Sequence, residues 1–564
     1  MAVLAEYLWI AVCGGIFGFM YGFLIGANDV ANAFATSVSS KSITLKQAVL
    51  IASICEFSGA FFLGASVTST VRSKIFDIDL YEDEPDVVML GMFTSLLSAN
   101  LWLFIATHFG IPVSTTHDVV GCIMGFSIAC KGFSSINWGV AVKIFISWLT
   151  SPLVAGIVAG CFFALVKYFV MRARNPFQRA YYLFPIVLTI GIGVDLAYVL
   201  YKGVAIVDVE EKFPPSWGIP VCIGCGAFCG LLWIFIFGPF AKKRVDARVA
   251  NRRAARVAAL AELEKADGVT NTQDKVEDGG FDDFRSFVYS ESAKPVVVAH
   301  VSGTEEGDAA AEDVPARKSV TIAVPNGDST NGGEESTADP SEDDPQTATQ
   351  SRKSLVNRFA ANTWDQDLHT QSMRESKRAQ QIWAQEEQFD ENAEGLFTFI
   401  QVFTASLNSF AHGANDVANT IAPMSAIMDI YKTGEVSSKT GVQKWVLAYG
   451  GSAIVIGLLL YGYRVMKSLG YKLTMLSPSR GSSAELGASL TVVTASFLGI
   501  PVSTTQCIVG AVTAVGLVGG RQSVDWFFLL KICGSWAALF FIACTFSAGV
   551  FSFAFYSPSQ VLPA

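Results

Sequence analysis

The sequence has 564 residues, of which 51% are apolar and only 16% are charged, with a formal net charge of −9. Soluble globular chains usually carry about a quarter of charged residues, so this low share indicates a membrane protein. The charge is also unevenly spread. Residues 241–394 hold 19 Lys or Arg and 30 Asp or Glu, a net of −11, and the rest of the chain has a net of +2. A body so poor in charge excludes a soluble enzyme, a disulfide-rich secreted domain and a nucleic-acid binder.

Apolar stretches that approach the roughly 20 residues needed to span a bilayer recur on both sides of this hydrophilic block. They are residues 8–32, 47–71, 87–109, 111–130, 138–170, 180–202 and 217–240 before the block, and 395–420, 442–463, 484–499, 500–518 and 526–557 after it. We expect 8–32 to be a retained transmembrane helix rather than a signal peptide, because no Lys or Arg precedes it. The short stretches 111–130 and 500–518 could instead be halves of re-entrant hairpins.

The Lys and Arg residues beside these spans predict their orientation, because positively charged loops stay in the cytosol. The hydrophilic block opens with seven Lys or Arg residues between 242 and 256, which predicts a cytosolic position. Counting crossings away from the block puts the N-terminus, the acidic loop at 77–86 and the C-terminal tail outside. The pattern predicts seven crossings, a cytosolic loop and five further crossings.

The hydrophilic block is expected to be largely disordered, with helices only at its ends. Residues 266–350 are rich in Glu, Asp, Ser, Thr, Gly and Pro and poor in aromatic residues, which is typical of disorder. The ends near 241–266 and 376–390 have compositions typical of helices. The first of these is basic and adjoins the membrane, so it could lie on anionic lipid or be a solvated charged helix.

Three motifs occur twice, in the same order and at offsets of 387 to 389 residues. They are GANDVAN at 26–32 and 413–419, GIPVSTT at 110–116 and 499–505, and K-I-x-x-S-W at 143–148 and 531–536. This recurrence predicts an internal repeat. An odd number of crossings separates the starts of the two units, so we expect them to be inverted. Inverted repeats with broken helices are the architecture of secondary transporters.

The predicted fold is therefore an all-α polytopic membrane protein with about 12 transmembrane segments in two inverted-topology repeats, with broken helices or hairpins. Residues 1–170 form the first repeat, and 171–240 contribute two linking helices. Residues 241–394 form the acidic cytosolic loop, and 395–564 form the second repeat.

The GANDVAN motifs place Asp29 and Asp416 at membrane depth, where an unpartnered carboxylate costs about 2.5–3.5 kcal/mol. We expect Gly26 and Gly413 to let the helix break at this point. Oxygens from the aspartates, from freed backbone carbonyls and from neighbouring asparagines would then form a cage for a small cation. Those asparagines are Asn28, Asn32, Asn415 and Asn419. Capping of ordinary helix starts is the alternative, which the duplication within membrane spans disfavours.

The GIPVSTT motifs predict half-helices that begin after the proline. The N-terminus of each half-helix would present unpaired N–H groups and the positive end of the helix dipole. The hydroxyls that would join them belong to Ser114, Thr115, Thr116, Ser503, Thr504 and Thr505. Two such ends that converge across a pseudo-twofold axis would hold a tetrahedral oxyanion. The alternative is ordinary Ser/Thr capping and packing in the membrane.

The charges of these motifs predict cation coupling. Neither motif contains Lys or Arg, so an anion beside Asp29 and Asp416 would be repelled unless cations bind with it. Glu56, in the middle of a span, is a further expected cation ligand. Glu485 is either a functional carboxylate or a charge favoured at a helix start. His117 and His412 break the symmetry of the repeat, and either could simply pack.

At these residues the sequence resembles the inorganic phosphate transporter (PiT) family, the sodium- or proton-coupled phosphate symporters, and it looks most like the sodium/phosphate symporters of fungi. The resemblance implies that Ser114–Thr116 and Ser503–Thr505 bind phosphate. It implies sodium near Asp29, Asn32, Asp416 and Asn419, and functional glutamates at Glu56 and Glu485. It also implies a homodimer in the plasma membrane.

The expected function is secondary active import of inorganic phosphate, driven by sodium or by protons. We expect no enzyme activity, no cofactor beyond the co-transported ion and no nucleic-acid partner. Sulfate or another oxyanion is an alternative substrate, although phosphate can donate a proton to a carboxylate and sulfate cannot. A phosphate sensor that signals through residues 241–394 is an alternative function.

Overall fold

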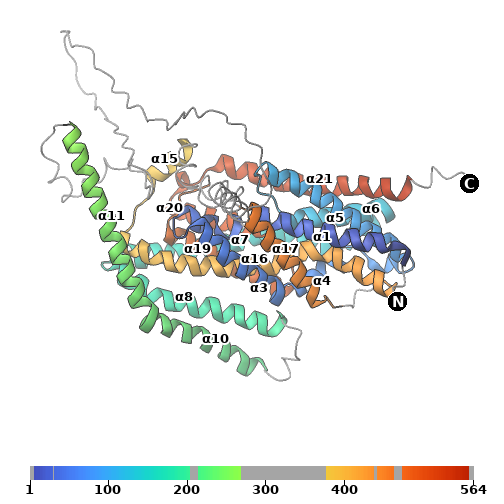
Figure 1. Ribbon diagram of the computed structural model, residues 1–564, viewed down its shortest axis with the longest axis horizontal. Coiled ribbons are helices and arrows are strands. Elements are labelled where there is room, and N and C mark those ends of the chain that lie inside the picture. The colour runs from blue at the N-terminus through green and yellow to red at the C-terminus, as the bar shows by residue number, and fades with distance from the viewer. Residues whose placement is uncertain are drawn as a thin grey trace, which may run out of the picture. The chain divides into compact units, whose positions relative to one another are not determined.

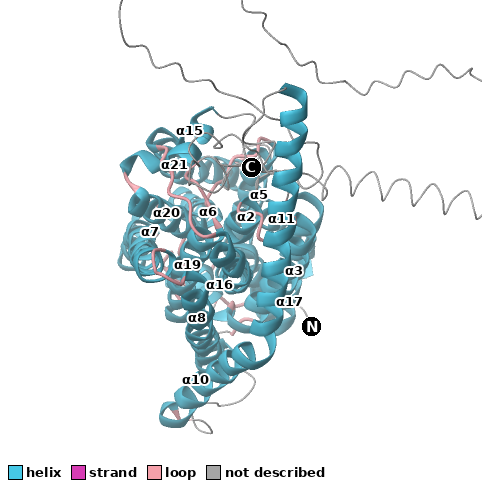
Figure 2. Cartoon of the chain, turned by 90° about the vertical axis from the view of Figure 1, so that its left-hand side faces the viewer, coloured by secondary structure: helices cyan, strands magenta, loops and turns pink. Residues whose placement is uncertain are grey.

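The computed structural model describes residues 5–29, 31–203, 214–267, 377–436, 441–462 and 473–557. The regular structure of these ranges is helical, as Figure 2 shows, apart from one antiparallel bridge between Phe76 and Ile136. The predicted all-α fold is therefore confirmed.

The helices follow the predicted spans closely. The first repeat contains α1 (Leu8–Asp29), α2 (Ala31–Ser39), α3 (Leu45–Leu63), α4 (Ala65–Ser73), α5 (Pro85–His108), α6 (Thr115–Lys131), α7 (Trp138–Leu165) and the π-helical turn η4 (Val166–Met171). The linking part contains α8 (Pro176–Tyr198), α10 (Pro215–Leu232) and α11 (Gly238–Asp267). The later part contains α15 (Lys377–Gln385), α16 (Glu391–Thr433), α17 (Lys444–Tyr461), α19 (Pro478–Leu498), α20 (Thr504–Gly519) and α21 (Trp526–Tyr556).

Within the described residues, eight helices are long and apolar enough to cross a membrane. The helices predicted at the two ends of the hydrophilic block are present as α11 and α15. Residues 268–350 of the stretch predicted to be disordered lie outside the described residues. Figure 1 shows α8 and α10 side by side at one edge of the bundle, and the two helices contact each other.

The GIPVSTT loops have the expected local structure in both repeats. Gly110 and Gly499 have φ angles of 65° and 69°, a left-handed conformation that glycine adopts without strain and that ends α5 and α19. Ser114 and Ser503 then cap α6 and α20 by accepting hydrogen bonds from the backbone N–H of residues 117 and 506. The short helices α6 and α20 therefore begin at the duplicated hydroxyl residues, as predicted.

The expected helix break at the GANDVAN motif is absent from the second repeat. In the second repeat the motif lies inside α16, which runs without interruption for 43 residues. In the first repeat α1 continues past Gly26 to Asp29. The glycines serve close packing instead: a Cβ at Gly26 would meet the Ile454 carbonyl oxygen at 1.9 Å, and one at Gly413 would meet the Glu56 carbonyl oxygen at 2.2 Å.

Contacts between the repeats are exchanged in matched pairs. Helix α1 packs on α17, and its counterpart α16 packs on α3, the counterpart of α17. Likewise α6 packs on α21 while α20 packs on α7. This exchange is what two structurally related repeats would produce if they faced each other across a twofold axis.

The buried apolar residues form two separate clusters. One cluster contains the later part of α7 and the early part of α16, together with α19 and α20. The other contains the early part of α7 and the later part of α16, together with α5 and α6. Helix α20 belongs to the first of these clusters and α6 to the second. The capped starts of the two helices, with the duplicated motifs, lie where the clusters adjoin.

Candidate functional site

The N-termini of α6 and α20 meet at the centre of the protein. The Thr116 hydroxyl donates to the Val502 carbonyl oxygen at 3.0 Å, and the Thr505 hydroxyl donates to the Val113 carbonyl oxygen at 3.2 Å. Each half-helix therefore bonds to the loop that precedes the other. The predicted convergence of the two Ser-Thr-Thr segments is present in the structure.

The two GANDVAN aspartates lie directly beside these helix ends. Thr115 donates its hydroxyl hydrogen bond to Asp29 at 2.8 Å, and Thr504 donates to Asp416 at 2.9 Å. Both aspartates are about 1% exposed. The matching distances show that the two repeats build the same contact between a carboxylate and a capped helix start.

The motif asparagines divide into two pairs with different surroundings. Asn28 and Asn415 were expected to add oxygens to a cation cage, but their side-chain oxygens accept bonds from the Val113 and Val502 backbone N–H groups, at 3.3 and 3.4 Å. They hold the GIPVSTT loops in place. In contrast, the Asn419 amide nitrogen donates to Thr115 and Thr116, and its buried side-chain oxygen has no hydrogen-bond partner among the described residues. That oxygen could coordinate a cation.

Asn32 lies in α2, and its side chain is outside the described part of the structure. In the second repeat, a proline leaves one backbone carbonyl of α16 without its usual hydrogen-bond donor. Pro423 lies inside α16 and has no N–H, so it cannot bond to the Asn419 backbone carbonyl four residues earlier.

His412 is the residue whose role the sequence did not reveal. Its Nδ1 lies 2.7 Å from a Glu56 carboxylate oxygen, and its Nε2 lies 3.0 Å from Asp416. Ser409 donates a hydrogen bond to the other Glu56 oxygen at 2.8 Å. The i, i+4 spacing of His412 and Asp416 on a helix was a usable signal, because such residues share one face.

Three buried groups could hold a small cation together. One ligand atom from each of Asp29, His412 and Asp416 lies within 4.8 Å of the others. Among the ion pairs formed by described residues, none joins Asp29, Glu56 or Asp416 to a Lys or Arg. When ionised, the carboxylates of Asp29, Glu56 and Asp416 give the centre a net negative charge whether His412 is neutral or charged.

Glu485 lies in a separate cluster of buried polar side chains. Thr36, Ser37 and Thr404 donate their hydroxyl hydrogen bonds to its carboxylate, and the Gln401 amide lies 3.2 Å away. The interpretation of Glu485 as a charge at a helix start is wrong, because α19 begins at Pro478 and Glu485 is fully buried two turns later.

Two further residues complete the placement. His117 stacks on Trp148 with ring centroids 3.7 Å apart and so packs rather than joins the carboxylates. Asp118, which the sequence reading missed, is fully buried and accepts a hydrogen bond from Tyr21 at 3.0 Å. An acidic residue in an apolar half-helix was the available signal.

This fold and site define a multi-pass membrane transporter, with a buried polar centre enclosed by duplicated helix ends. The profile of the Phosphate transporter family matches residues 25–547, so the chain belongs to that family. This match confirms the resemblance drawn from the motifs.

Known proteins agree over nearly the whole length. The chain is 32% identical to the phosphate-repressible phosphate permease pho-4 of Neurospora crassa, covering 95% of each chain. It is 30% identical to the sodium-dependent phosphate transporter 1 of Rattus norvegicus, covering 97% of this chain and 95% of the relative. A solved structure of a sodium-dependent phosphate transporter is 25% identical, with a TM-score of 0.66 and coverage of 98% and 100%.

Proposed function

We propose that this protein imports inorganic phosphate together with sodium ions by alternating access. The observation that carries the proposal is the meeting of two capped helix N-termini with two buried aspartates directly behind them. The helix ends suit an oxyanion and the carboxylates suit cations. Relatives named as sodium-dependent phosphate transporters support the same pairing of solutes.

The phosphate contacts are proposed at Ser114–Thr116 and Ser503–Thr505. The caps satisfy only part of each helix end, so further backbone N–H groups are left to face an anion. Ser114 and Ser503 accept cap bonds, and among the described residues no acceptor takes their hydroxyl protons. The serine hydroxyls are therefore the donors best placed to reach phosphate.

Sodium is proposed at Asp29, Asn32, Asp416, Asn419 and Glu56. Without cations the centre is net negative and repels phosphate, so bound sodium raises the affinity for the anion. This dependence is reciprocal, because two ligands that favour each other's binding do so by the same free energy. Protons are the alternative coupling ion.

The proposed setting is the plasma membrane, with the N- and C-termini outside and residues 241–394 in the cytosol. The two repeats are proposed to be inverted, which the exchanged helix contacts support. The protein is also proposed to act as a homodimer in the lipid bilayer.

The test is uptake of radiolabelled phosphate by cells or proteoliposomes that carry the protein. We expect uptake to collapse when external sodium is replaced by choline, and Asp29→Asn to lower it at least about tenfold. Asp83→Asn, in the exposed acidic loop, is the matched control and should transport normally. Unchanged uptake in choline would contradict sodium coupling, and competition by excess sulfate would identify a broader oxyanion carrier.

A further inference from the structure

The end of the hydrophilic block lies against the membrane-embedded part of the protein. We call residues 377–389, which comprise α15 and the four residues after it, the strap. Helix α15 contacts the short turn η8 (Arg521–Ser523) that follows α20. Ile382 of the strap is 2% exposed and Glu386 is 6% exposed, so the strap is packed onto the protein.

Three basic residues form the surface that receives the strap: Lys167, Arg172 and Arg480, which we call the basic inner surface. Arg480 is 2% exposed and donates hydrogen bonds to the Glu386 carboxylate at 2.8 Å and to the Glu387 carbonyl oxygen at 3.0 Å. Its guanidinium also lies over the Phe389 ring, 5.3 Å from the centroid. A buried charge of this kind needs its partner.

Glu387 binds the other two basic residues. Arg172 donates two hydrogen bonds to it, both at 2.8 Å, and Lys167 lies 3.2 Å away. The bonds from Arg172 lower the pKa of the Glu387 carboxyl. Because the pKa of Glu387 is lowered, its stabilising ion pairs are fully formed at pH values above the usual pKa of a glutamate. They are lost only as the pH falls below that usual pKa. The strap is therefore held at cytosolic pH.

The strap ties together elements of both repeats. Lys167 lies in η4 at the end of the first repeat, Arg172 directly follows η4, and Arg480 lies in α19 of the second repeat. Lys167 also donates to the Val518 carbonyl oxygen of α20 at 3.1 Å, and a Cβ at Gly519 would meet the Glu386 carboxylate at 2.8 Å. Helix α20 starts at the candidate site, so the strap covers the far end of a helix whose other end faces the proposed substrate.

We propose that the basic inner surface is a docking site for the strap, bound through Glu386 and Glu387, and that docking keeps the central site closed toward the cytosol. The match of two acidic with three basic side chains identifies this segment of the chain as the occupant. The strap must leave before phosphate can be released inside, so the hydrophilic block controls transport through its own end. The direction of opening rests on the proposed function.

The test follows the thiol of Cys507, which is fully buried in α20 three residues after Thr504. Inside-out vesicles with the full-length protein are treated with a thiol reagent without phosphate or sodium, and labelling is read peptide by peptide by mass spectrometry. We expect Glu387→Ala to raise the labelling rate of Cys507 about fivefold or more, because the closed state loses the ion pairs of Glu387 with Arg172 and Lys167. Arg172→Ala should raise the rate less, because Lys167 remains.

The double variant Arg172→Ala/Glu387→Ala should label no faster than Glu387→Ala, because the two residues act through one contact. Arg174→Ala is the matched control: it lies in the same loop, is exposed and should leave the rate unchanged. Labelling that stays at the wild-type rate, or independent effects of the two substitutions, would overturn the proposal.

A second thiol separates opening from general loosening. Cys122 is equally buried, in α6 and in the other apolar cluster. Its labelling should stay low in Glu387→Ala. If Cys122 and Cys507 rise together, the variant loosens the whole protein and the proposal fails. The labelling is measured without phosphate and sodium, so it does not depend on transport. A protein that failed to take up phosphate would contradict the proposed function, and the labelling rates would still test the role of the strap.

Discussion

At the scale of single residues, the centre of the protein is more asymmetric than its motifs. Thr115 with Asp29 is matched by Thr504 with Asp416, but His412 has no such counterpart because Ile25 stands at its place in the first repeat. His412 therefore brings the one imidazole that bridges Glu56 and Asp416. The surroundings of the candidate cation site are therefore not symmetric between the repeats.

His412→Gln is expected to lower phosphate uptake at least about tenfold, because an amide cannot carry charge between two buried carboxylates. The control is His117→Gln, which installs the residue that the second repeat carries as Gln506 and should retain uptake. Uptake and the amount of protein in the membrane are measured together. Equal uptake in both variants would remove His412 from the site.

Ser114→Ala and Ser503→Ala are each expected to raise the KM for phosphate about tenfold or more, because a hydrogen bond to a charged group contributes about 1.5–3 kcal/mol. Thr513→Ala, in α20 but bonded to its own helix at Val509, should leave the KM unchanged. Concentration-dependent uptake at fixed sodium gives the values. A fall in maximal rate with an unchanged KM would argue that the serines only cap their helices.

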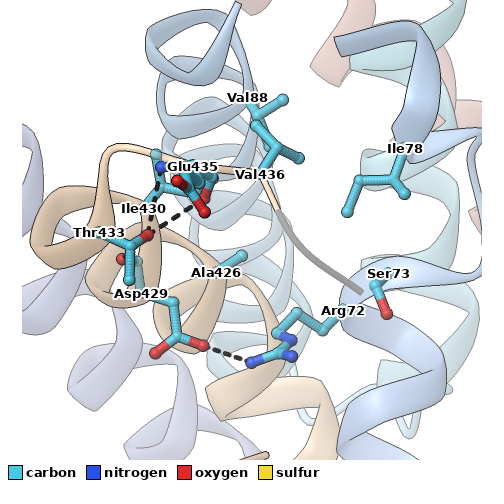
Figure 3. Close-up of a pocket in the computed structure, with 10 residues that line it drawn as sticks. All are labelled: Arg72, Ser73, Ile78, Val88, Ala426, Asp429, Ile430, Thr433, Glu435 and Val436. Carbon is cyan, nitrogen blue, oxygen red and sulfur yellow. Dashed lines mark hydrogen bonds and ion pairs between the residues drawn. The ribbon is translucent and has the colours of Figure 1, made fainter. Parts of the chain in front are cut away.

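At the scale of elements, an ion pair joins α4 to α16 at the end of the protein opposite the strap. Arg72 of α4 pairs with Asp429 of α16, and the two side chains are 3% and 14% exposed. Figure 3 shows this pair beside Ser73, Thr433 and Glu435, which line the same small cavity of about 20 Å³. Asp429 also accepts a hydrogen bond from Gln443 at 3.3 Å.

Asp429→Asn should destabilise the protein by about 3 kcal/mol or more, because Arg72 stays charged and buried without its partner. Glu84→Gln breaks the exposed pair with Lys131 and should cost less than about 1 kcal/mol. Thermal unfolding of the purified protein in one detergent compares the two. A similar melting temperature for both variants would show that the Arg72 pair contributes little.

At the scale of the whole molecule, the sequence predicted the helical fold and the approximate positions of its helices, because apolar length and polar duplication are local signals. It did not predict their number: about 12 spans were expected, and eight described helices are long and apolar enough to cross a membrane. The α6 and α20 starts were predicted because proline, glycine and serine act on their own neighbours. The continuity of α16 was not, because Gly413 serves contact with Glu56, which is 357 residues away in the chain. The contact of His412 with Glu56 was missed for the same reason, because two segments so far apart in the chain show no regular spacing. The i, i+4 spacing of His412 and Asp416 was visible in the sequence.

The proposed orientation predicts where tags become accessible. Epitope tags at the N- and C-termini should be stained by antibody on intact cells, whereas a tag inserted within 266–350 should be stained only after permeabilisation. The same three insertions are compared for phosphate uptake to show that each protein is assembled. Staining of the loop tag on intact cells would reverse the topology.

The uninterrupted α16 joins the strap to the Arg72 pair through a single helix. At about 1.5 Å per residue its 43 residues extend about 65 Å, so the helix passes through both apolar clusters. One end of the helix follows the strap, and the other end pairs with Arg72 through Asp429. His412, Asp416 and Asn419 lie near the middle of the helix. Pro423 makes one soft point in this helix, a single turn beyond Asn419. Pro423 therefore separates the part of α16 that carries His412, Asp416 and Asn419 from the part that carries Asp429, and a bend at this proline would change the distance between the candidate site and the Arg72 pair.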